Sequence, residues 1–265
     1  MQSPDVPEID QSEPHQARVW NYFLGGKDNY EADRVFAEQI LQAYPAMRDV
    51  ARHTRGFLGR AIGHLTAEKG IRQFLDVGTG LPTAGNTHEV AQAIAPESRI
   101  VYVDNDPLVL VHAQALLTST PEGACAYLDA DAREPEKILE AAAETLDFTR
   151  PIALSILGVL GTIWDDDDAR ATLAVLVNAL PSGSYLLIED GTNTVNVEEA
   201  AEAEKVRDEG GYNYKLRTPE QIAGFFDGLE LLEPGVVSVS RWRPEETPWG
   251  LPAEIDAYCG VGLKH

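Results

Sequence analysis

The 265-residue sequence predicts an α/β fold, in which helices pack on both faces of a seven-stranded, mostly parallel sheet. Short apolar runs are spaced like buried strands and are separated by helical patterns; they lie at 71–77, 99–104, 124–128, 151–157 and 184–189. The first run leads into Asp76-Val77-Gly78-Thr79-Gly80, and a helix follows from about Gly85. A strand, a glycine turn and a helix in this order are typical of the ligand-binding edge of a Rossmann-like sheet.

The charge balance limits the classes of partner. The sequence holds 43 Asp and Glu residues against 21 Lys and Arg, which gives a formal net charge of −22. A surface this acidic repels nucleic acid and anionic lipid. Neither is therefore expected as a partner. No apolar run approaches the roughly 18 residues of a membrane helix, and the N-terminus has no signal-peptide pattern. We therefore expect a cytoplasmic monomer or homodimer that acts on a small molecule and keeps its two cysteines reduced.

The first 70 residues read as an extension of the sheet domain. Residues 1–15 hold prolines and acids without periodicity, which predicts a flexible tail. Residues 16–70 predict a helical arm, with a short helix that ends at Gly25-Gly26 and further helices over 33–44 and 47–67. Its dense aromatic residues either anchor the arm to the core or cover a ligand as a lid. The core then spans 71–265, with an insert near 191–217.

Acidic residues follow three of the predicted strands. Asp76 lies at the end of the first strand, Asp104 ends the second, and Asp131 follows the third. Because parallel strands end at one edge of a sheet, Asp104 is placed to accept both hydroxyls of a ribose. Asp106 precedes Pro107 and is expected to cap the helix that begins there.

The second half of the chain continues the alternation of helices and strands. The four aspartates at 165–168 open a helix, where acids favour capping over a metal site, so no metal is expected. Helices over 197–209 and 219–227 follow the fifth strand. Two strands at 236–242 and 255–263 finish the sheet, and the last one is expected to run antiparallel.

These motifs resemble one family. The series Asp76-x-Gly78-x-Gly80, Asp104 and Asp131 is similar to class I S-adenosylmethionine (SAM)-dependent methyltransferases, whereas a dinucleotide fingerprint requires a third glycine where Thr83 stands. Longer stretches are similar to the S-adenosyl methyltransferase family, formerly a domain of unknown function; they lie at 18–30, 57–61, 71–86, 101–107 and 225–237. The resemblance runs from about residue 16 to residue 265.

The resemblance implies that SAM is the cofactor, with S-adenosylhomocysteine (SAH) as its product. The residues that it assigns to cofactor binding are Asp76, Gly78, Gly80, Asp104, Asn105, Asp131, Ala132, Leu157 and Gly158. It puts Asp76 near the methionine amino group, Asp104 on the ribose and Asp131 on the adenine amino group. Acids suit a ligand that carries a sulfonium and an ammonium, and without phosphates it needs no basic clamp.

The sequence does not name the methyl acceptor. Relatives usually carry a histidine after the fourth strand, where this chain has Gly161. We expect alignment to supply much of the catalysis, with Tyr22, His53 and His88 as candidate bases. The acceptor pocket is expected between the arm residues 16–30 and the insert.

Three functions remain open. Methyl transfer from SAM to a small molecule is the leading one. A protein that binds SAM or SAH without turnover is the second, because Gly161 stands in place of the histidine. A NAD(P) oxidoreductase is the third, and Thr83 and Asp131 argue against it.

Overall fold

One mixed sheet organises the structure, a computed structural model that describes residues 10–116, 118–246, 248 and 250–265. Its strand order is β3-β2-β1-β4-β5-β8-β6, and β7 pairs with β8 beside that path. The strands are β1 (Gln73–Val77), β2 (Arg99–Asp104), β3 (Ala124–Asp129), β4 (Ala153–Leu157), β5 (Tyr185–Gly191), β6 (Glu230–Leu231), β7 (Val237–Ser238) and β8 (Ala257–Leu263).

Strand directions confirm the predicted mixed sheet. β1 to β5 are parallel to one another, and β8 runs antiparallel to β5. The sheet differs in detail at its outer edge, where the predicted strand 236–242 shortens to β7 and the two-residue β6 pairs with the other end of β8. The chain turns after Ser238, whose carbonyl accepts from the Arg241 N–H at 2.8 Å, and this turn ends the pairing.

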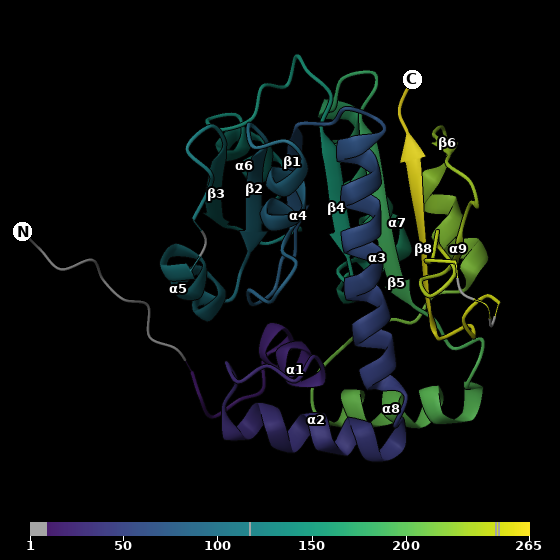
Figure 1. The fold of residues 1–265 in the computed structure, drawn as a ribbon. Helices are drawn as coiled ribbons and strands as arrows, with labels where there is room; N and C mark the ends of the chain where they lie inside the picture. The colour runs from purple at the N-terminus through teal and green to yellow at the C-terminus, as the bar shows by residue number, and fades with distance from the viewer. Residues whose placement is uncertain (1–9, 117, 247, 249) are drawn as a thin grey trace, which may run out of the picture.

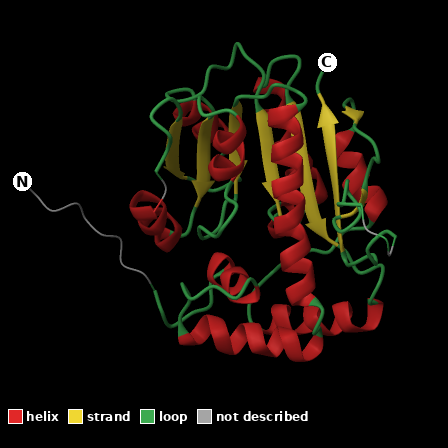
Figure 2. Cartoon of the chain, viewed as in Figure 1, coloured by secondary structure: helices red, strands yellow, loops and turns green. Residues whose placement is uncertain are grey.

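Helices cover both faces of the sheet (Figure 2). The α-helices among the described residues are α1 (Gln16–Phe23), α2 (Glu31–Ala43), α3 (Met47–Ala67), α4 (Thr87–Ile94), α5 (Pro107–Leu116), α6 (Pro135–Ala142), α7 (Asp166–Ala179), α8 (Val197–Glu209) and α9 (Pro219–Ala223). Phe74 of β1 packs with the apolar side of α3, while its neighbour Leu75 packs with the side of α6 and α7. Among the described residues, none of these helices combines the length and apolar character needed to cross a membrane.

Three helices lie across the carboxyl ends of the parallel strands. Figure 1 shows α1, α2 and α8 below the sheet, with α2 and α8 side by side. Of the predicted tail 1–15, residues 1–9 lie outside the described residues. The rest is held by Arg18, whose guanidinium donates to the carbonyls of Asp10 at 2.8 Å and Glu13 at 3.1 Å.

The predicted helix caps are confirmed. The Asp165 carboxylate accepts from the backbone N–H groups of Asp167 at 2.8 Å and Asp168 at 3.1 Å. Asp106 accepts from the N–H of Leu108 at 2.8 Å. Each cap satisfies backbone donors that have no partner inside the helix.

The close contact at Gly78 gives a test of the turn after β1. Gly78 has φ of +75°, and a Cβ there would lie 2.0 Å from Cγ2 of Val159. Gly78→Ala is therefore expected to lower the free energy of unfolding in urea by about 2 kcal/mol. Gly59→Ala on α3 is the control, because its Cβ meets nothing within 4 Å and alanine favours a helix. Equal effects of the two variants would contradict this account.

Candidate functional site

A cavity of about 400 Å³ lies between the carboxyl edge of the sheet and the arm. The strand order reverses between β1 and β4, which is where open α/β sheets bind ligands. All the residues that the sequence predicted for cofactor binding line this cavity: Asp76, Gly78, Gly80, Asp104, Asn105, Asp131, Ala132, Leu157 and Gly158.

The turn after β1 leaves room for a ligand. The N–H groups of Gly78 and Thr79 both donate to the Val103 carbonyl, at 2.8 and 3.1 Å, and tie the turn to β2. Gly80 has φ of +66°, and a Cβ there would meet nothing within 4 Å. The backbone at Gly80 therefore borders open space on the cavity side.

Asp104 braces this turn from the neighbouring strand. Its Oδ2 accepts from the Gly80 N–H at 2.8 Å, and its Oδ1 accepts from the Asp106 N–H at 3.0 Å. Burial raises the pKa of Asp104 although both hydrogen bonds lower it. Each carboxylate oxygen can accept a second hydrogen bond, so Asp104 retains capacity for a ligand hydroxyl.

Asp76 is held by hydroxyl groups. Its two oxygens accept from Ser155 at 2.7 Å and from Thr87 at 2.6 Å. Burial raises the pKa of Asp76, and the hydroxyls of Thr87 and Ser155 offset part of that rise. The side chain is thereby fixed in one orientation on the cavity wall.

Asp131 has a partner that the sequence analysis missed. Arg133 donates to it from Nε at 2.8 Å and from Nη2 at 2.6 Å, and Asn105 donates at 3.2 Å. The Arg133 hydrogen bonds lower the pKa of Asp131 to about 2. A ligand amino group would share this carboxylate with Arg133.

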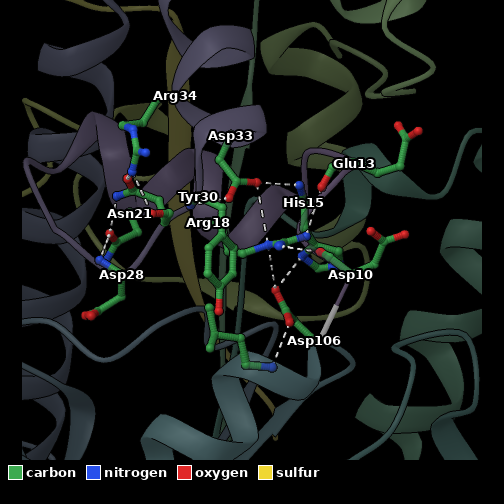
Figure 3. A network of polar contacts seen from close by, with 12 residues as sticks. Asp10, Glu13, His15, Arg18, Asn21, Asp28, Tyr30, Asp33, Arg34 and Asp106 are labelled. Carbon is green, nitrogen blue, oxygen red and sulfur yellow. Dashed lines mark hydrogen bonds and ion pairs between the residues drawn. The ribbon is translucent and has the colours of Figure 1, made fainter. Parts of the chain in front are cut away.

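The arm closes the cavity with one face of α1. Gln16, Trp20 and Phe23 line the wall, and the Gln16 amide donates to the Gly158 carbonyl at 3.2 Å. Figure 3 shows the opposite side, where Arg18 lies between two acids. Its Nε is 3.5 Å from Asp33 and 3.7 Å from Asp106, and both pairs are buried.

None of the three candidate bases lines the cavity. Tyr22 lies on another face of α1, where its hydroxyl bonds to Glu38 and Arg48 covers its ring. His88 is buried, with Nδ1 2.8 Å from the Tyr102 hydroxyl. Burial and then the charge of Arg60 lower the pKa of His53, which is partly buried on α3. The geometry therefore favours none of them as the base.

Two cavity residues were missed from the sequence. Glu189 on β5 is 2% exposed, its Oε2 has no hydrogen-bond partner among the described residues, and burial followed by the charge of Asp190 raises its pKa to about 8. It ends the strand predicted over 184–189, as Asp104 ends the one predicted over 99–104, and this signal could have identified it. Arg207 lies on α8, at helical spacing from the buried Ala200 and Ala203.

The backbone at Gly161 is covered by a side chain that is distant in the sequence. A Cβ on Gly161 would lie 2.4 Å from Cζ of Tyr214 in the insert, so the tyrosine ring rests on the Gly161 backbone. The Lys215 N–H donates to the Gly161 carbonyl at 2.8 Å. The Tyr214 hydroxyl donates to Asp190, which also pairs with Arg217 at 3.2 Å. Tyr214 also lines the cavity, so it is part of the wall.

This packing predicts a specific coupling between residues 161 and 214. Gly161→Ala should destabilise the protein by about 1–3 kcal/mol, because the new methyl group overpacks the tyrosine ring. The same substitution in a Tyr214→Ala background should cost almost nothing. A double-mutant cycle by urea unfolding measures the coupling. Additive effects would contradict the contact.

Comparison with known proteins agrees with this architecture. The chain matches the S-adenosyl methyltransferase family over residues 2–265. It is 43% identical to a DUF574-family protein of Streptomyces avermitilis, with a TM-score of 0.93 over 97% of this chain and 100% of that one. It is 39% identical to a proposed methyltransferase of Thermobifida fusca, with a TM-score of 0.88 over 99% of each chain.

A more distant likeness concerns the fold alone. A SAM-dependent methyltransferase of Anabaena variabilis is 14% identical, with a TM-score of 0.53 over 98% of this chain and 99% of that one. No curated protein matches the sequence. The family match and the two close structures together show that this chain belongs to the S-adenosyl methyltransferase family of SAM-dependent enzymes.

Proposed function

We propose that the protein transfers the methyl group of SAM to a small-molecule acceptor. The observation that carries the proposal is a single cavity that joins the glycine turn to Asp76, Asp104 and Asp131. When bound, SAM supplies a methyl group that its sulfonium makes electrophilic. A lone pair of the acceptor forms the new bond to the methyl carbon, and the electrons of the carbon–sulfur bond remain on the sulfur of SAH.

The residues present suit such a cofactor. The space over Gly80 admits a ligand close to the backbone, and Asp104 can accept ribose hydroxyls while it holds the turn. Burial raises the pKa of both Asp76 and Asp104, so a cation beside them would be favourable. Asp131 would take the adenine amino group, with the Ala132 amide donating to a ring nitrogen.

We further propose Glu189 as the base that replaces the three earlier candidates. Its side chain lies on the cavity wall beside Gly158, whose added Cβ would be 3.8 Å from Glu189 Oε2. With a pKa of about 8 the Glu189 carboxyl is mostly protonated at pH 7, and the deprotonated fraction, which grows as the pH rises, can accept a proton. The proton released by the acceptor nucleophile would move to this oxygen as the methyl bond forms.

A binding protein without turnover is the second candidate. It is favoured by Gly161, which carries no side chain that could act as a base and whose backbone is covered by the ring of Tyr214. Both candidates retain the cofactor site, so only an acceptor assay separates them.

The cysteines Cys125 and Cys259 are free, which supports a reducing, cytoplasmic location.

The cofactor site is tested with Asp104→Asn. The variant keeps an oxygen for the Gly80 N–H but loses a charged acceptor, so SAH should bind about tenfold or more weakly, since such bonds contribute about 1.5–3 kcal/mol. Asp129→Asn is the matched control, because Asp129 is exposed at the end of β3 and does not line the cavity. Titration calorimetry measures both affinities. Wild-type protein that binds NADH and not SAH would overturn the proposal.

The raised pKa of Glu189 predicts a pH effect on stability. Its folded-state pKa of about 8 exceeds the usual 4.5, so its stabilising contribution is complete below pH 4.5 and is lost as the pH rises through 8. Glu189→Gln removes this dependence. The difference between the unfolding free energies of Glu189→Gln and wild type should therefore shift in favour of the variant, by on the order of a few kcal/mol, as the pH rises from 5 to 8.5. Exposed Glu198→Gln is the control; parallel curves for wild type and Glu189→Gln would reject the assignment.

A further inference from the structure

We propose that the methyl acceptor is a small carboxylic acid with an aromatic or apolar body, and that Arg207 binds its carboxylate. The proposal rests on the proposed methyl transfer and names the substrate class for it.

Arg207 lacks the partner that a buried guanidinium requires. It is 6% exposed and lines the cavity, yet its side chain forms no ion pair or hydrogen bond with any described residue, and its Nε and Nη2 are both buried. Its guanidinium lies over the ring of Tyr214, 5.9 Å from the centroid, and the charges of Glu204 and Asp208 act on it without forming an ion pair. A buried charge without a counter-ion is costly, so a ligand anion is the natural partner.

The other buried arginines of the chain show the contrast. Arg18 pairs with Asp33 and Asp106, and Arg217 pairs with Asp190 and Asp166. Of the other arginines that line the cavity, Arg133 pairs with Asp131 and Arg55 donates to Asn86 at 2.7 Å, so Arg207 is the exception among the described residues. The exception lies where a ligand can reach it.

The position of Arg207 favours the acceptor over the cofactor. Its guanidinium lies over the ring of Tyr214. That ring rests on Gly161, which follows β4, and lies beside Gly191, which ends β5. The proposed ribose and adenine residues follow β2 and β3, on the other side of β1 in the sheet. The methionine carboxylate of SAM has a nearer candidate in Arg55, which lines the cavity and acts on the charge of Asp76.

The wall around Arg207 indicates the rest of the acceptor. The apolar and aromatic residues of the arm and the insert that line this cavity include Ile40, Tyr44, Met47, Val50, Tyr212 and Leu216. Such a wall suits a hydrophobic body. The planar guanidinium can hold a carboxylate through two parallel hydrogen bonds, which would fix the orientation of that body.

The test uses the whole protein saturated with SAH. Aryl carboxylates (benzoate, phenylacetate, 4-hydroxybenzoate and 3-phenylpropionate) are compared with their primary amides by titration calorimetry. We expect one or more acids to bind at least tenfold more tightly than the matched amide. In Arg207→Met this preference should vanish, while SAH affinity stays within twofold of wild type.

Further outcomes show whether Arg207 binds the carboxylate of the acceptor or that of the cofactor. If Arg207→Met weakens SAH tenfold and leaves the acids unchanged, the guanidinium holds the cofactor and the proposal is wrong. Equal binding of acids and amides, or no acid binding to a wild type that does bind SAH, also overturns it. Wild type that fails to bind SAH overturns the proposed function instead. Arg207→Lys keeps the charge and should retain part of the preference, and thermal unfolding checks that both variants fold.

Discussion

Three helices close the carboxyl edge of the sheet, and this takes the charged groups of the cavity out of water. Every such group must then find a partner inside the protein or in a ligand. Asp104 finds backbone N–H groups, and Asp76 finds hydroxyls. Oε2 of Glu189 and the guanidinium of Arg207 have none among the described residues, so they mark where a ligand would complete the site.

The closure depends on Arg18, which joins the arm to the cofactor side of the sheet. Its guanidinium contacts Asp33 of α2 and Asp106 ahead of α5. The N–H of that same Asp106 donates to Asp104. Asp106, which pairs with the arm, therefore lies two residues from Asp104, which is proposed to bind ribose.

Local signals predicted the sheet and the acidic residues that line one side of the cavity, because parallel strands bring their ends to one edge whatever the loops do. Asp104 and Asp131 follow from that topology alone. Whether Tyr22 faces the cavity depends on how α1 is rotated, which the sequence pattern leaves open, and Trp20 and Phe23 lie on the cavity side. Tyr214 reaches its place through packing between segments far apart in the sequence, which no local pattern records.

Gly161 shows how such a contact changes the interpretation of a sequence. Taken alone, the glycine suggests that a catalytic group has been lost. In the fold, the ring of Tyr214 covers its backbone, and the tyrosine hydroxyl is committed to Asp190 and the buried Arg217. Burial and the charge of Asp190 raise the pKa of Tyr214 well above 10, so the phenol stays protonated and cannot act as a base near neutral pH. Burial and the charge of Asp190 raise the pKa of the neighbouring Glu189 carboxyl to about 8, which supports the proposal that the proton is taken by a residue of β5 instead of one after β4.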